Sequence, residues 1–165
     1  MTVRLAPVMQ AGVYTAVPFF VFAVSEPLGN WVADSLIGRG WKETPTRKGI
    51  IVVGFLTGLL LIPATLVSNL TLAVALVAGA SLVGLTPANS PVILQACAPA
   101  DEVGRWSGFQ NFTGNIGGTP AATGPLIRLR GSYLPGFTLA VGVLLGGIFA
   151  YCFIVGEKIP PSRST

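Results

Sequence analysis

Residues 49–100 read GIIVVGFLTGLLLIPATLVSNLTLAVALVAGASLVGLTPANSPVILQACAPA, an uninterrupted run without Asp, Glu, Lys or Arg. As a single α-helix this run would be about 78 Å long, whereas the hydrocarbon core of a bilayer is about 30 Å thick. The run therefore has to fold back on itself, and Ser68-Asn69 is the polar break early enough for a turn. It predicts two membrane-spanning helices, over residues 49–67 and 70–97.

The rest of the chain has the same apolar character. Of its 165 residues, 52% are hydrophobic and only 10% are charged, and the mean hydropathy is +0.72. Soluble domains carry roughly 25% charged residues. Two further stretches, residues 106–127 and 131–156, also lack charged side chains. We therefore predict an all-α fold, a polytopic transmembrane bundle of about five helices. Its spans are expected at residues 11–37, 49–67, 70–97, 106–127 and 133–155, followed by a polar tail over residues 156–165.

The distribution of Lys and Arg predicts the orientation in the membrane, because cytoplasmic loops are enriched in both residues. If the loop at residues 38–48 lies inside, seven of the ten basic residues also lie inside. The N-terminus is then outside and the C-terminus cytoplasmic, in a multi-pass protein of the plasma or bacterial inner membrane. Because the N-terminus is predicted outside and the number of helices is odd, we expect a further part of the protein to precede this sequence. The inner group comprises Arg39, Lys42, Arg47, Lys48, Arg105, Lys158 and Arg163, and the outer group Arg4, Arg128 and Arg130.

Several functional classes find no support in the sequence. The chain has no His, and Cys97 and Cys152 stand in apolar runs without zinc-ligand spacing, so we expect no metal site and two buried thiols. The basic residues cluster at helix ends, which does not indicate a nucleic-acid surface. The glycine-rich residues 114–118 lack the strand and the Lys-Ser/Thr ending of a phosphate loop. The sequence therefore predicts no enzyme, no cofactor and no nucleic-acid partner, with the lipid bilayer as its surroundings.

Amide side chains inside the expected spans are the first candidate site. Asn111 and Asn115 share one face of the fourth expected span, and Gln110 lies on the neighbouring stripe. Unpaired amides are costly inside a membrane. They serve either as hydrogen-bonded contacts between helices or as a solute-facing stripe, and the sequence leaves both interpretations open. Asn89 and Ser90, between two prolines in the third span, are expected to face the same cavity.

Two acids lie within the first expected span. Ionisable residues at such positions are functional candidates. Asp34 is near the inner boundary, and we expect it to pair with Arg39 or with a helix N-terminus. Glu26 lies deeper. Three roles remain open for it: a protonation site that couples ion movement, a structural pair with a partner outside the sequence, or a position in a wet vestibule.

Small residues recur at spacings that bring helices close together. The pairs share a helix face and predict close helix contacts rather than chemistry. They are Gly54 with Gly58, Gly114 with Gly118, and Gly142 with Gly146.

Three stretches resemble the major facilitator superfamily, specifically its anion:cation symporter branch. Residues 29–34, which read GNWVAD and are followed by Arg39-Gly40, look like the eighth helix and the loop after it. Residues 98–104 look like the inner connection before the eleventh helix. Residues 108–118, which read GFQNFTGNIGG, look like the eleventh helix itself and are the most specific part. The resemblance covers nearly the whole chain.

This resemblance implies the C-terminal part of a twelve-helix fold, helices eight to twelve, with the N-terminal half and helix seven absent from the sequence. Members of the branch move organic anions such as galactonate, hexuronate or tartrate together with a proton or a sodium ion. The resemblance implies that Asn111 contacts substrate and that Asp34 belongs to a loop motif that latches the inner gate. The chain departs from this motif at Asn30, where Gly is usual, and at Ser35, where Arg or Lys is usual.

Two functions follow as hypotheses. In the first, the chain is part of a proton- or cation-driven symporter of small organic anions, in which Gln110, Asn111 and Asn115 bind solute and Asn89 and Ser90 assist. Asp34 and Arg39 then help to close the inner gate, and Glu26 is a candidate for coupling. In the second, the chain is a non-transporting membrane protein, either truncated or a helical module that pairs with another chain.

Overall fold

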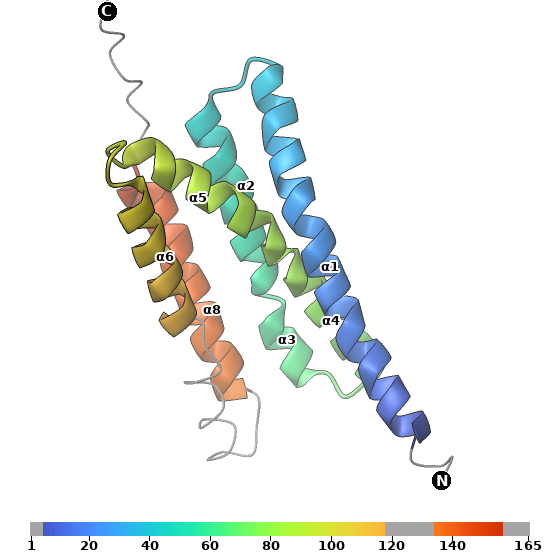
Figure 1. Cartoon of the computed structure of the whole chain (residues 1–165). Coiled ribbons are helices and arrows are strands. Elements are labelled where there is room, and N and C mark those ends of the chain that lie inside the picture. The colour runs from blue at the N-terminus through green and yellow to red at the C-terminus, as the bar shows by residue number, and fades with distance from the viewer. Residues whose placement is uncertain (1–4, 118–133, 157–165) are drawn as a thin grey trace, which may run out of the picture.

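The computed structural model describes residues 5–117 and 134–156, and every regular element in these ranges is a helix (Figure 1). The predicted all-α bundle is therefore confirmed. The first helix, α1, is the longest in this part of the chain and includes Pro18 and Pro27. The elements are α1 (Leu5–Gly38), α2 (Glu43–Gly58), α3 (Leu61–Leu66), α4 (Leu70–Ala80), the 3-10 turn η2 (Ser81–Gly84), α5 (Leu85–Cys97), α6 (Val103–Gly117), α8 (Leu134–Phe149) and the π-helical turn η3 (Ala150–Ile154).

Four segments within the described residues are long and apolar enough to cross a membrane. Two of them combine shorter elements: α2 continues into α3, and α4 continues through η2 into α5. The fourth expected span is represented by α6, and residues 118–133 lie outside the described part, as does the tail beyond residue 156. The four segments are Ala11–Gly38, Glu43–Leu66, Leu70–Cys97 and Leu134–Ile154.

The charge-free run of residues 49–100 turns at Ser68-Asn69, as predicted from the sequence. Asn69 caps α4, because its side-chain Oδ1 accepts a hydrogen bond of 3.1 Å from the backbone N–H of Leu72. The second span begins earlier than its apolar residues suggested. Its helix α2 begins at Glu43 and thus includes charged side chains in its first two turns. An acid in the first turn interacts favourably with the helix dipole, which accounts for the early start.

A close backbone contact joins α1 to η2 and the start of α5. A Cβ atom placed on Gly29 would lie 2.7 Å from the carbonyl oxygen of Leu85, and one placed on Gly84 would lie 2.6 Å from that of Phe22. The neighbouring Ser25 and Ala33 on α1 are buried. Only glycine permits two backbones to approach this closely, so these two positions fix how α1 crosses the third span.

The glycine pairs predicted from their spacing divide into two groups. Gly54 faces the Thr86 hydroxyl and Gly58 faces the Leu144 side chain, as expected of close helix contacts. Gly142 and Gly146 instead face open space, as does Gly114, and Gly118 lies outside the described residues. In α8 the close contact is made by Gly147, where a Cβ atom would lie 2.8 Å from the Phe55 ring. Spacing alone does not identify which face of a helix is covered.

Three segments gather at one end of the bundle. Figure 1 shows that the α1–α2 connection, the α5–α6 connection and the C-terminal end of α8 lie together, whereas α1 begins at the opposite end. This arrangement requires the three segments to share one side of a membrane. The excess of Lys and Arg predicts that this side is the inner one.

Candidate functional site

Two neighbouring residues on α5 take part in two separate polar clusters. Successive residues of an α-helix point about 100° apart. Asn89 has no exposed surface and packs toward α2. Ser90 points the other way, toward α6 and η3. The prediction that both side chains face the same cavity is therefore wrong.

Arg47 is the centre of the first cluster, which we call the ion-pair cluster (Asp34, Glu43, Arg47 and Asn89). Its Nη2 lies 2.8 Å from Asp34 Oδ1, and its Nη1 donates a 3.0 Å hydrogen bond to Asn89 Oδ1. Its Nε donates a longer bond of 3.4 Å to Glu43 Oε1. The residue is only 9% exposed, so the guanidinium is a buried charge supported by two acids and an amide. The cluster joins α1, α2 and α5 at the end of the bundle where α2 begins.

The partner of Asp34 differs from the predicted one. Arg39 or a helix N-terminus was expected to pair with Asp34, but Arg39 lies exposed in the turn after α1 and forms no ion pair within the described residues. Gly40, with a φ of 93°, reverses the chain there, so that the first turns of α2 lie beside the end of α1. Arg47 thereby comes within reach of Asp34, although Arg39 is nearer to Asp34 in the sequence.

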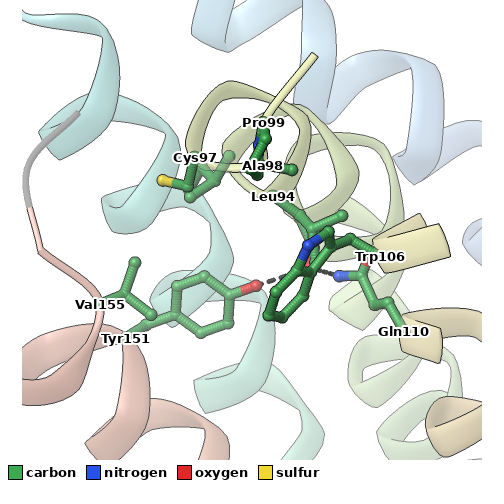
Figure 2. A pocket seen from close by; sticks show the side chains of 10 residues that line it. Leu94, Cys97, Ala98, Pro99, Trp106, Gln110, Tyr151 and Val155 are labelled. Atoms are coloured by element: carbon green, nitrogen blue, oxygen red, sulfur yellow. Dashed lines mark hydrogen bonds between the residues drawn. The ribbon is translucent and has the colours of Figure 1, made fainter. Parts of the chain in front are cut away.

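A cavity of about 290 Å³ holds the second cluster, the polar triad (Ser90, Gln110 and Tyr151). Gln110 Nε2 donates a 2.8 Å hydrogen bond to Ser90 Oγ, and the hydroxyls of Ser90 and Tyr151 lie 2.6 Å apart. Figure 2 shows Tyr151 reaching across the cavity toward Trp106 and Gln110. The rest of the lining is mainly apolar. It comprises Ile93, Leu94, Cys97, Ala98, Pro99, Trp106 and Val155.

The remaining predicted site residues lie apart from the triad. Asn111 follows Gln110 on α6 and is exposed on the bundle surface. Asn115 is also on α6, but its side chain is outside the described part of the structure. Glu26 is exposed on α1 and contacts neither cluster. The structure thus brings Ser90 together with Gln110, and Asp34 together with Asn89.

Sequence reasoning missed Arg47 and Tyr151. Arg47 stands in a charged stretch that resembles a connecting loop, and nothing in its neighbourhood marks it as buried. Tyr151 belongs to η3, and π-helical turns of this kind often occur at functional sites. The sequence did contain one indication of Tyr151, a phenol hydroxyl within an otherwise apolar span. The two cysteines were expected to be buried, but both are exposed, and Cys97 lies in the lining of the cavity.

We expect Ser90→Ala to destabilise the chain more than Tyr151→Phe. The serine substitution leaves both the Gln110 amide and the Tyr151 hydroxyl without their partner, whereas the phenylalanine removes only one bond. Losses of about 2 and about 1 kcal/mol in the free energy of unfolding are expected. Unfolding by dodecyl sulfate in mixed micelles, followed by circular dichroism, measures both. Equal losses for the two variants would contradict the shared role of the serine hydroxyl.

Comparison with known proteins relates the chain to transporters. It is 33% identical, over 90% of its own length, to a protein of Bacillus subtilis named as the uncharacterized transporter YybO. It is 28% identical to the D-galactonate transporter of Escherichia coli, again over 90% of the chain. Identity to a probable galactarate/D-glucarate transporter of Escherichia coli is 30% over 91% of the chain. No protein-family model matches the chain.

The matched portion is short relative to these proteins, because the chain spans about a third of their length: 35% of the first two and 34% of the third. The relatives are named as transporters rather than as enzymes. Together with four helices able to cross a bilayer, this similarity indicates a multi-pass membrane protein. The resemblance predicted from the sequence is thereby confirmed: along about nine-tenths of its length, the chain is similar to a segment of proteins named as transporters, two of them for D-galactonate and for galactarate/D-glucarate.

Proposed function

We propose that the chain forms one side of a transport path for small organic anions, in a secondary transporter driven by a proton or another cation. The observation that carries this proposal is the polar triad, which presents two hydroxyls and an amide to a cavity between α5, α6 and η3. Polar groups at such a position mark solute paths. Two of the relatives are named as transporters of D-galactonate and of galactarate/D-glucarate, which supports the same function.

The chemistry of the triad suits the hydroxyl groups of a solute. Hydroxyl and amide side chains both donate and accept hydrogen bonds, as sugar hydroxyls do. The triad itself carries no formal charge, so we propose that the carboxylate of the anion is neutralised by groups outside this cavity. Sugar acids such as galactonate, with several hydroxyls and one carboxylate, fit this division. Asn111 and Asn115, further along or around α6, remain proposed solute contacts, and Asn89 is proposed to act through Arg47 instead.

The ion-pair cluster is proposed as a latch at the inner end of the path. It joins α1 to α2 and α5 through one guanidinium, so opening between these helices has to break the contact between Arg47 and Asp34. Asp34 keeps the gating role proposed for it, and Arg47 takes the place proposed for Arg39.

Binding of D-galactonate is tested through the fluorescence of Trp106, which lines the cavity. The substitutions Trp31→Phe and Trp41→Phe leave it as the single tryptophan, because the chain has three. We expect saturable quenching by D-galactonate and an affinity about tenfold weaker in Gln110→Leu, since one set of hydrogen bonds is lost. Gln95→Leu is the matched control, because Gln95 is exposed on α5 away from the cavity. Quenching that is absent, or equal in both variants, would contradict the proposed site.

The second hypothesis is a non-transporting membrane module that pairs with another helical chain. Alternating access in transporters of this kind requires two units that move against each other. The module hypothesis predicts that the chain alone produces no D-galactonate flux in liposomes, with or without a pH gradient. Robust flux from the chain alone would reject it, whereas binding without flux agrees with one side of a path.

A further inference from the structure

Four side chains form a stripe along one side of α1, which runs from an apolar groove to the acid Glu26. Thr15, Phe19, Phe22 and Glu26 are spaced by four, three and four residues and therefore lie on the same side of the helix. The first three line a mainly apolar groove of about 770 Å³ between α1 and α4, to which Ser81 of η2 and Phe137 of α8 also contribute. Phe19 is 71% exposed, so the described helices leave this side open.

Glu26 lies near the middle of its span. It is about 22 Å from Ala11 and about 18 Å from Gly38 along the helix axis, at 1.5 Å per residue. Its side chain is exposed and forms no ion pair or hydrogen bond within the described residues. A carboxylate at this depth is costly when it faces acyl chains, and such groups pair with other polar groups. The groove and the acid together therefore require a partner that is apolar along most of its length and positive at one point.

We propose that this stripe docks a transmembrane helix that lies outside the present sequence and carries Arg or Lys near its middle. The apolar side chains of that helix fill the groove that α1, α4 and Phe137 of α8 line, and its basic side chain pairs with Glu26. This inference rests on the proposed function in one respect, because it treats the chain as one side of a larger transport unit.

A second copy of this chain does not meet the requirement. Its basic residues stand at the ends of the spans, and residues 49–104 contain none at all. A neighbouring copy therefore offers no positive charge at the depth of Glu26. Charge complementarity thus favours a different helix over self-association.

The pairing is tested with a designed peptide in bilayers that contain the whole chain. The probe is a leucine-rich transmembrane peptide of about 23 residues with one central Arg, and a second peptide has Leu at that position. Energy transfer between a donor on the chain and an acceptor on the peptide reports association. We expect the Arg peptide to bind the unsubstituted chain about tenfold more tightly than it binds Glu26→Gln, and the Leu peptide to show no such difference.

Two controls separate the pairing from general effects. Asp101→Asn removes an acid in the α5–α6 connection and is expected to leave association unchanged. Ala73→Trp fills the groove and is expected to weaken association of the Arg peptide, while circular dichroism confirms that the helices remain folded.

Equal binding of the Arg peptide to Glu26→Gln and to the unsubstituted chain would overturn the proposal, as would the absence of association with either peptide. No solute takes part in this measurement. Its failure therefore leaves the D-galactonate experiment intact, and the failure of D-galactonate binding leaves the docking surface intact.

Discussion

Arg47→Met is expected to lower the free energy of unfolding by about 3 kcal/mol. The substitution keeps a long apolar side chain but removes the guanidinium that pairs with Asp34 and donates to Asn89. Because Asn89 is fully buried, its Oδ1 then has no donor and pays the cost of desolvation. The side chain of Asp34 is 66% exposed and is rehydrated, which limits the loss on that side. Unfolding in dodecyl sulfate micelles measures the difference.

Two further variants make this result specific. Arg39→Met removes the exposed arginine that was one of the two partners predicted for Asp34, and we expect the free energy of unfolding to change by no more than about 0.5 kcal/mol. Arg47→Lys keeps the charge but lacks the planar fork that reaches two acceptors, so an intermediate loss is expected. If Arg39→Met destabilised the chain as much as Arg47→Met, the ion-pair cluster would not be the structural centre of this end of the bundle.

Gly29→Ala and Gly84→Ala are each expected to destabilise the fold by about 2 kcal/mol. Both new methyl groups would meet a backbone carbonyl, at 2.7 Å for Gly29 and 2.6 Å for Gly84. A backbone atom cannot move aside as a side chain does, so α1 has to shift away from η2 and α5. The same unfolding measurement detects the loss, and a cysteine cross-link between the two segments would report their separation.

Gly142→Ala and Gly146→Ala provide the matched comparison. They have the spacing of a close helix contact, but a Cβ atom at either position would meet nothing within 4 Å. Replacing an exposed helical glycine by alanine stabilises a helix by up to about 1 kcal/mol. We therefore expect a small gain from these two substitutions and a loss from the other two. A loss at Gly142 comparable to that at Gly29 would mean that spacing, rather than the observed packing, governs these contacts.

The helical bundle was predictable because its cause is local. A charge-free run as long as residues 49–100 has no stable alternative to crossing and re-crossing a membrane, and the polar break at Asn69 marks its turn. The first turns of α2 were not predicted as helix because they contain charged residues. A pattern of apolar residues identifies only the part of a helix that lies in the apolar layer. Helix boundaries at the membrane surface depend on capping and on tertiary partners, which a pattern of apolar residues does not contain.

The candidate site was predictable only in part. Amides in α6 and a polar break in α5 were visible as costly residues within apolar spans, and the structure joins one of each, Gln110 and Ser90. Their separation from Asn89 depends on which face of α5 meets which neighbour. Arg47 and Tyr151 depend on contacts between residues far apart in the chain, such as the 61 positions that separate Ser90 from Tyr151. A single sequence without these contacts does not identify them.

The central claim is that the amide-bearing side of α6 meets an aqueous path rather than acyl chains. The most direct test introduces Asn111→Cys into a chain in which Cys97 and Cys152 are replaced by serine, and treats proteoliposomes with a charged, membrane-impermeant methanethiosulfonate. Val143→Cys, at an exposed position of the apolar helix α8, is the lipid-facing reference. The account predicts rapid modification at position 111 and slow modification at position 143. Modification that is equally slow at both positions would contradict it.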